Sequence, residues 1–128
     1  MLRKHIVVVG SGWAGLRLVR KLKKVNYSDI RITLVSDSPN FRYSAALYRA
    51  ATGFKVQEAI IPISQLTSDI PSLSFIKSKA TKINKQKRII TLSGGQELHY
   101  DYAVLALGSV TTYFGIPGLS EYSYGIKS

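Results

Sequence analysis

A glycine-rich hexapeptide near the start of the chain, GSGWAG at residues 10–15, constrains the fold more than any other feature. The residues before it, His5 to Gly10, form an apolar β-branched run that predicts a short buried strand. From Ala14 to about Val25, apolar side chains recur at helical spacing while Arg and Lys occupy the other face, which predicts a helix. Residues 30–35 predict a second strand, parallel to the first because a helical crossover joins them. The chain therefore begins with a strand, helix, strand unit of the α/β class.

This order of elements gives the hexapeptide the features of a dinucleotide-binding loop. Gly10 permits the tight turn, Gly12 lets a pyrophosphate approach the backbone, and Gly15 lets the helix pack on the strand. The helix N-terminus adds N–H groups and a positive dipole for the phosphates. We therefore predict that this loop, which also contains Ser11 and Ala14, binds a dinucleotide.

The end of the second predicted strand departs from the fingerprint, which places an acidic residue there for a ribose hydroxyl. Ser36 occupies that place and Asp37 follows it. Either Ser36 makes a weaker hydrogen bond to the ribose or Asp37 turns towards it, and the sequence leaves both open. The departure does not point to NADP, which would need a nearby arginine as the partner of its 2′-phosphate. Arg42 is the only near candidate for that role.

The middle of the chain predicts two helices and a third core strand. Residues 41–52 read as a mostly apolar helical segment closed by Gly53, and residues 63–68 predict a second short helix. Residues 73–76 form an apolar run typical of a buried strand.

Beyond residue 78 the sequence changes to an alternation of apolar and polar residues. Residues 79–100 predict an antiparallel hairpin around a Gly94-Gly95 turn, within a small meander. Residues 102–107 form a last apolar run, ended by Gly108. Together these elements predict a Rossmann-like FAD/NAD(P)-binding fold, a parallel βαβ sheet plus a small antiparallel β-meander, as one domain over residues 1–128.

The amino-acid composition excludes several kinds of functional site. The 128 residues contain no Cys and only two His, which excludes a disulfide framework and a cysteine nucleophile and leaves no expected metal site. No apolar run approaches the roughly 20 residues that span a bilayer, and no signal peptide is evident, so we expect a cytoplasmic chain without a transmembrane segment.

The charge leaves an alternative function open. A net charge of +11 favours contact with phosphates, anionic lipids or an acidic partner. The basic residues cluster within residues 17–24 and 77–88. Two solvated faces explain them most simply, and no nucleic-acid motif accompanies them, so nucleic acid is not a favoured partner. The alternative is a basic nucleotide- or polyanion-binding module on a Rossmann scaffold. An NAD-binding dehydrogenase is a third possibility.

Several segments together resemble one family, the FAD-dependent pyridine nucleotide-disulfide oxidoreductases, and within it the type II NADH dehydrogenases. The resemblance covers nearly the whole chain. It is carried by the glycine loop, LVSDSPNF at 34–41, AATG at 50–53, YDYAVLALGS at 100–109 and FGIPG at 114–118. The last two segments, in this order and spacing, are the most specific to these flavoproteins.

The resemblance implies FAD as cofactor, with NADH as the substrate of the complete enzyme. It implies hydride transfer from NADH to flavin and onward transfer of electrons to an acceptor such as a quinone, because the Cys pair of the disulfide reductases is missing. It assigns no catalytic side chain. The cofactor-binding residues that we predict are Gly10, Ser11, Gly12, Ala14, Gly15, Ser36, Asp37, Thr52, Gly53, Ala80, Ala106, Leu107 and Gly108.

The resemblance also leads us to expect an amino-terminal FAD-binding fragment. Members of the family continue into an NADH-binding domain and then complete the FAD domain, so we expect this fold to be incomplete at its C-terminus and the chain alone to be inactive. Surface left uncovered in this way would favour a homo-oligomer. The complete enzyme could lie peripherally at the membrane.

Overall fold

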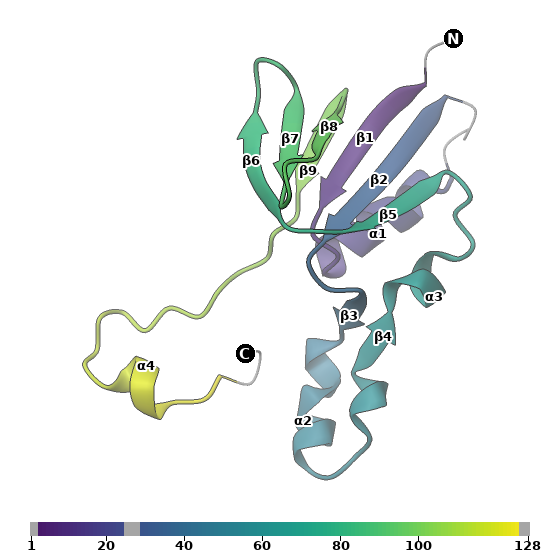
Figure 1. The fold of residues 1–128 in the computed structure, drawn as a ribbon. Helices are drawn as coiled ribbons and strands as arrows, with labels where there is room; N and C mark the ends of the chain where they lie inside the picture. The colour runs from purple at the N-terminus through teal and green to yellow at the C-terminus, as the bar shows by residue number, and fades with distance from the viewer. Residues whose placement is uncertain (1–2, 25–28, 126–128) are drawn as a thin grey trace.

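A four-stranded parallel sheet forms the centre of the computed structural model, which describes residues 3–24 and 29–125 (Figure 1). Its strand order is β5-β2-β1-β9, with β1 at Lys4–Val9, β2 at Ile30–Ser36, β5 at Leu73–Lys77 and β9 at Tyr102–Leu105. All three neighbouring pairs are parallel, and Val8 lies between Leu34 and Val104. The predicted parallel sheet and its first three strands are confirmed.

Both faces of β1 are buried, which explains its continuous apolar sequence. Val8 packs with Leu16 and Val19 of helix α1 (Trp13–Leu22) in one core cluster. Val7 and Val9 belong to a second cluster on the opposite face. Alternate side chains of a strand point to opposite faces, so this one strand contributes to both cores. Helix α1 ends at Leu22, earlier than predicted, and Val25 lies outside the described residues.

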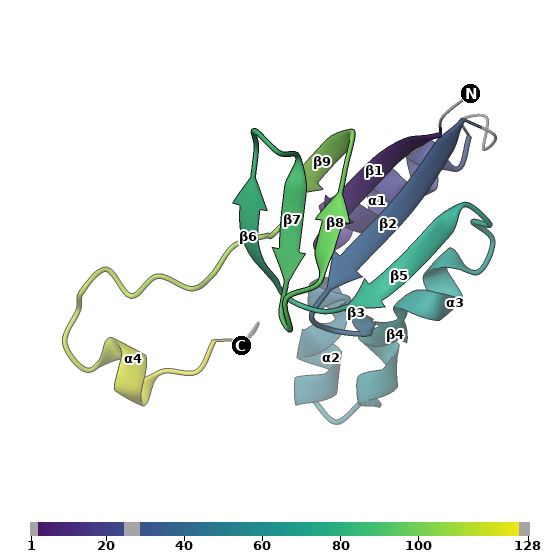
Figure 2. The same cartoon turned by 45° about the horizontal axis from the view of Figure 1, so that its top comes forward.

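The second face of the parallel sheet is covered by the predicted meander (Figures 1 and 2). Strands β6 (Ala80–Asn84), β7 (Ile89–Leu92) and β8 (Glu97–His99) form an antiparallel sheet in that order. Ile90 and Leu92 of β7 are buried against Val7, Val9 and Val35. Gly94 and Gly95 both have positive φ, as the predicted turn requires.

The connection from β2 to β5 differs from prediction. Residues 41–52 do not form one helix, because strand β3 (Asn40–Arg42) pairs antiparallel with β4 (Ile60–Pro62). Only the later part is helical, as a 3-10 turn at Ser44–Ala46 and helix α2 at Leu47–Ala51. A second 3-10 turn, Val56–Glu58, precedes β4, and the predicted short helix follows it as α3 (Ile63–Thr67). Burial of Phe41 against α1 is a long-range effect that overrides local helix propensity.

The chain leaves the sheet after β9, which ends at Leu105 rather than at the predicted residue 107. Ala106 makes one more bond, from its N–H to the carbonyl oxygen of Val9 at 2.7 Å. The following arm projects away from the sheet and carries the short helix α4, Leu119–Tyr122 (Figure 1). Its large apolar side chains are exposed, with Phe114 at 86% and Tyr122 at 88%.

Candidate functional site: a pocket where the strand order reverses

A pocket of about 390 Å³ opens at the carboxyl ends of the parallel strands. From β1 the chain crosses to β2 on one side and returns to β9 on the other, which makes this edge the topological switch point of the sheet. Ligands of open α/β sheets bind at such points. The pocket is lined by Gly10, Ser11, Gly12, Ser36, Asp37, Ser38, Asn40, Arg42, Ile60, Ala106, Leu107 and Gly108.

Two glycines of the loop pack backbone against backbone. A Cβ at Gly15 would lie 1.9 Å from the carbonyl oxygen of Gly10, so α1 can approach β1 only because residue 15 has no side chain. A Cβ at Gly10 would lie 2.2 Å from the carbonyl oxygen of Ala106, and the φ of Gly10 is +104°. Gly10 therefore fixes both the turn after β1 and the contact with the segment after β9.

Gly12 has a different environment. A Cβ placed there meets no described atom within 4 Å, and its backbone is extended, with φ −74° and ψ −167°. The residue is the N-cap of α1, and no described side chain caps the helix. The first N–H groups of a helix have no intrahelical acceptor and attract anions. Gly12 therefore leaves open the space in front of these donors, including that of Ala14.

The end of β2 forms a wall of the pocket. Ser36 is buried, and its Oγ accepts a hydrogen bond of 2.8 Å from Ser11 Oγ and one of 3.3 Å from the backbone N–H of Ser38. Asp37 is exposed at the pocket. The two ribose candidates thus lie side by side, Ser36 as an inward hydroxyl and Asp37 as a carboxylate at the rim.

Four lining residues were not predicted as cofactor contacts: Ser38, Asn40, Arg42 and Ile60. They reach the pocket because β3 turns back beside the end of β2 and pairs with β4. The sequence names Arg42 only as a candidate partner for a 2′-phosphate. No local pattern marks Ile60, because its position depends on its pairing with Arg42 of the partner strand β3.

Five predicted residues do not line the pocket: Ala14 and Gly15 in the first turn of α1, and Thr52, Gly53 and Ala80 farther along the chain. Thr52 and Gly53 lie just after α2, where the Thr52 hydroxyl donates to the carbonyl oxygens of Tyr48 and Arg49 at 3.1 and 3.0 Å. Ala80 begins β6, pairs with Leu92 and packs in the cluster beneath the meander. Any role of these residues in cofactor binding remains a prediction.

A second hollow of about 670 Å³ lies along α1. Trp13, Leu16, Phe41 and Leu66 give it an apolar floor, and five basic residues of the helix and its C-terminal turn line the rest. Trp13 is 61% exposed and meets the rings of Phe41 and Tyr43 edge-on, at centroid distances of 5.1 and 5.3 Å.

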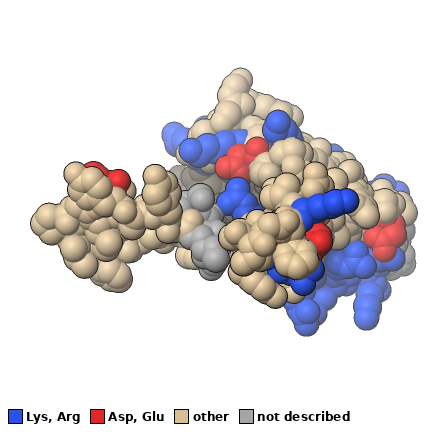
Figure 3. Space-filling model, turned by 90° about the horizontal axis from the view of Figure 1, so that it is seen from below, with Lys and Arg blue, Asp and Glu red and all other residues tan. Residues whose placement is uncertain are grey.

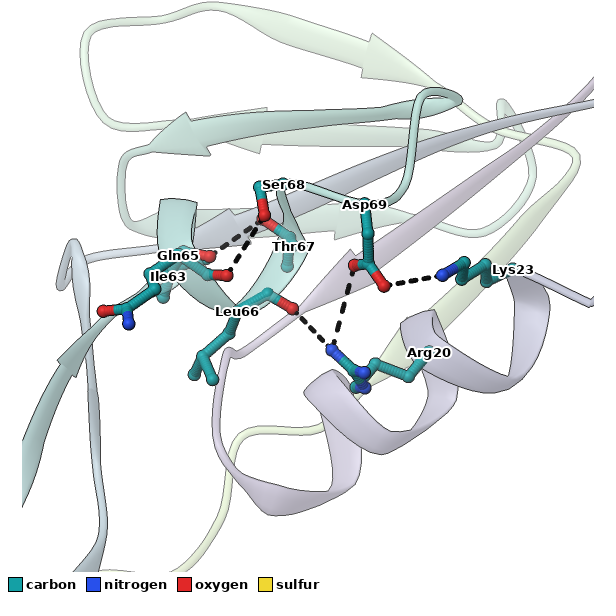
Figure 4. Close-up of polar contacts among 8 residues, drawn as sticks. All are labelled: Arg20, Lys23, Ile63, Gln65, Leu66, Thr67, Ser68 and Asp69. Carbon is teal, nitrogen blue, oxygen red and sulfur yellow. Dashed lines mark hydrogen bonds and ion pairs between the residues drawn. The ribbon is translucent and has the colours of Figure 1, made fainter.

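Asp69 holds two of these basic residues. Figure 4 shows Arg20 and Lys23 reaching from α1 towards Asp69, at 3.9 and 2.6 Å, and Arg20 also donates to the carbonyl oxygen of Leu66 at 2.8 Å. The pKa of Asp69 is lowered, chiefly by its hydrogen bond from Lys23. These contacts tie α1 to the segment after α3.

The fold and the pocket together define a Rossmann-like domain of the dinucleotide-binding class. The model of the pyridine nucleotide-disulphide oxidoreductase family matches residues 4–128, so the chain belongs to this family. The predicted family resemblance is confirmed.

Of two similar relatives, one is named as a type II NADH:quinone oxidoreductase, as the resemblance implies, and the other as a sulfide-quinone reductase. The chain is 32% identical over 126 residues to sulfide-quinone reductase from Aquifex aeolicus. It is 33% identical over 129 residues to type II NADH:quinone oxidoreductase from Staphylococcus epidermidis. Each match covers 98% of this chain but only 29% and 31% of the respective relative.

Solved structures agree on the fold. The sulfide:quinone oxidoreductase of Aquifex aeolicus matches with a TM-score of 0.86 at 32% identity, over 98% of this chain and 29% of that chain. NDH2 from Plasmodium falciparum, solved in complex with NADH, matches with a TM-score of 0.80 over 95% of this chain and 26% of that chain. At 22% identity the second match supports the fold alone. Within residues 3–24 and 29–125, no helix is long and apolar enough to cross a membrane.

Proposed function

We propose that this chain is the FAD-binding portion of an NADH dehydrogenase of the NADH:quinone type. In such an enzyme hydride passes from NADH to the flavin, and electrons pass on to an acceptor. The observation that carries the proposal is the pocket at the switch point, which combines the open backbone of Gly12 with the contact between Gly10 and Ala106. The family membership and the relatives named for NADH and quinone support it.

The described residues fit the adenosine diphosphate half of FAD. The empty space at Gly12 in front of the α1 N-terminus suits a pyrophosphate, which needs N–H donors and no side chain in its way. Ser36 and Asp37 suit the ribose, and the Arg42 side chain adds a cation to the lining. Ala106, Leu107 and Gly108 suit the side of the nucleotide that faces β9.

The chemistry of electron transfer would belong to the bound flavin, and the protein would supply position and electrostatics. The loop packs closely on the segment after β9 at Gly10, and the Ser11 hydroxyl bonds to Ser36 at the end of β2. In the complete protein we propose a location in the cytoplasm, peripheral to the membrane.

Flavin binding tests the proposal directly. The chain is purified, titrated with FAD, and followed by flavin fluorescence and visible absorbance. We expect saturable binding that excess ADP competes away, because ADP shares the half of FAD that the pocket fits. Saturable binding of NADH without binding of FAD would instead identify an NAD-binding dehydrogenase domain.

A second candidate function is the binding of polyanions along α1. Arg17, Lys21 and Lys24 follow one another at helical spacing and are exposed, and no ion pair to them occurs within the part of the chain that the structure describes. In Figure 3 many Lys and Arg side chains lie at the lower right of the view and others lie higher on the main body, whereas none appears on the described part of the arm at the left. This unpaired row continues from the exposed Trp13.

Salt dependence separates the two functions. We expect the affinity of the wild type for heparin to fall steeply with salt concentration. Changing Arg17, Lys21 and Lys24 to Gln should reduce the slope of log affinity against log salt concentration by roughly three. Changing Lys82, Lys85 and Lys87 to Gln in the meander removes the same charge and is the matched control. Equal losses in both variants would show only the effect of net charge, and FAD binding should be unchanged in either.

A further inference from the structure

The hollow along α1 combines an apolar floor with a basic rim. Leu16 and Phe41 belong to the floor and are only 7% and 6% exposed, whereas Trp13 is largely exposed and Leu66 is half-buried. Five Lys and Arg side chains line the rest of the hollow. No described residue lines both this hollow and the pocket at the switch point, so the two are separate cavities.

The basic side chains of the rim fall into two groups. Two of them are held by Asp69 on the side of α3, as Figure 4 shows. The other three, Arg17, Lys21 and Lys24, are exposed and make no ion pair within residues 3–24 and 29–125. Like charges three and four positions apart on a helix repel one another. An anion beside these three cations would relieve that repulsion.

The floor and the rim together restrict the kind of ligand. A polyanion such as heparin supplies charge but has no apolar part to cover the floor, and a neutral lipid supplies no group for the cations. A flat bilayer does not reach Leu16 and Phe41, because these nearly buried side chains lie below a rim of long basic side chains. A single alkyl chain is narrow enough to enter.

We propose that the hollow along α1 binds a single-chain amphiphile with a phosphate head group. The alkyl chain lies on the apolar floor, and the head group lies beside the three unpaired cations. A phosphate monoester has a charge of about −1.5 to −2 at neutral pH, which suits three cations better than a single carboxylate charge does. The inference is independent of the FAD pocket. It shares its cations with the polyanion candidate and adds the alkyl chain.

Calorimetric titration of the wild-type protein tests the two parts of the ligand separately. The probes are octyl phosphate, butyl phosphate, octanoate, octanol and inorganic phosphate, each below the concentration at which it forms micelles. We expect octyl phosphate to bind more tightly than butyl phosphate by about 10-fold or more, because each fully buried methylene group contributes roughly fourfold. It should also bind more tightly than octanol, which lacks the charge, and than octanoate, which has less of it.

Two variants assign these effects to the rim and to the floor. Changing Arg17, Lys21 and Lys24 to Gln should reduce the preference for octyl phosphate over octanol by roughly 3- to 150-fold, the product of three exposed ion pairs. The Lys to Gln variant of the meander, which removes the same charge elsewhere, is the matched control and should keep the preference. Leu66→Gln keeps the length of the side chain but makes the floor polar, so it should reduce the advantage of octyl over butyl phosphate.

Several outcomes would overturn the inference. Equal affinities for octyl and butyl phosphate in the wild type would leave only polyanion binding, and this comparison holds even if Leu66→Gln does not fold. Equal affinities for octyl phosphate and octanoate would refute the phosphate head group. Binding to anionic lipid vesicles without binding of octyl phosphate would indicate a membrane surface instead. Competition by ADP would place the ligand in the other pocket. Failure with octyl phosphate alongside intact FAD binding refutes this inference and leaves the proposed function standing.

Discussion

At the scale of single residues, the glycines of the loop have separable tasks. Gly12 faces empty space, whereas Gly15 is enclosed by the backbone of Gly10. The fingerprint gives the two positions the same residue type for different physical reasons. Substitution at one should therefore affect the ligand, and substitution at the other should affect the fold.

Gly12→Val is expected to weaken FAD binding by about 100-fold or more, because a branched side chain fills the space that a pyrophosphate needs. The backbone at Gly12 is extended and suits valine, so the free energy of unfolding should fall by no more than about 1 kcal/mol, the cost of a poor N-cap. Flavin fluorescence titration and urea unfolding measure the two effects. Unchanged flavin affinity would argue against the cofactor assignment.

Gly15→Ala is expected to destabilise the fold by about 1–3 kcal/mol or more, because its Cβ would lie 1.9 Å from the carbonyl oxygen of Gly10. The direction of the change in unfolding free energy is informative, because replacing Gly with Ala within a helix ordinarily stabilises the helix by about 1 kcal/mol. Urea unfolding of this variant is compared with Gly12→Ala, where the added methyl group meets open space. A stabilised Gly15→Ala protein would mean that α1 does not pack this closely on β1.

At the scale of elements, the attachment of β9 to β1 depends on a polar cluster at their shared end. The His5 backbone N–H donates to Asp101 at 2.7 Å, and this bond is the main cause of the lowered pKa of Asp101. The His5 ring is buried, with Nε2 2.8 Å from Thr33 Oγ1 and Nδ1 2.5 Å from the carbonyl oxygen of His99. One cluster thus links β1, β2 and the end of the meander.

This cluster predicts an acid-sensitive fold. Burial, followed by the nearby Arg31 charge, lowers the pKa of His5 below its ordinary value of 6.5. The unfolded chain then binds a proton more readily than the folded one, so stability is present above pH 6.5 and falls as the pH drops below it towards the folded pKa. Asp101 contributes stability above its ordinary pKa of 3.8, which is lost as the pH falls further through its lowered value.

Urea unfolding from about pH 8 to about pH 5 measures the effect. We expect the unfolding free energy of the wild type to decline over this range, and His5→Gln to remove much of the decline. His99→Gln changes the other histidine of the chain and should leave the decline in place. If the decline persists in His5→Gln and vanishes in His99→Gln, His5 is not the residue that makes the fold sensitive to acid.

At the scale of the whole molecule, the last strand and the arm after it expose many large apolar side chains. Beyond β9 the arm exposes Val110, Phe114, Tyr122 and Tyr124, and β9 itself exposes Leu105. Among the described strands, β9 pairs only with β1 and forms an edge of the sheet. Exposed apolar side chains beside an unpaired strand edge favour association.

We therefore expect the isolated 128-residue chain to form a dimer or a larger discrete oligomer. The +11 charge opposes association, so added salt should favour it by screening the repulsion. Light scattering after size exclusion at low and high salt gives the mass. A monomer under both conditions, with cooperative unfolding, would mean that this apolar surface needs no partner.

The sequence alone determined the elements whose causes are local. A β-branched run, a glycine loop and helical spacing specified β1, α1 and β2, and the glycines at 94 and 95 specified the turn of the meander. Each of these depends on residues that are neighbours along the chain, where backbone preference and side-chain periodicity act directly. The family could be recognised for the same reason, because its motifs are continuous segments.

Only the tertiary structure decided how distant segments meet. The pairing of β3 with β4 replaced the first part of a predicted helix and brought Arg42 and Ile60 to the pocket. The contact of Gly10 with Ala106 joins residues from opposite ends of the chain, and the Ser11 to Ser36 bond crosses from one strand end to another. Such contacts depend on the register and packing of whole elements, which no local pattern encodes, and they are what turn a recognisable loop into a site.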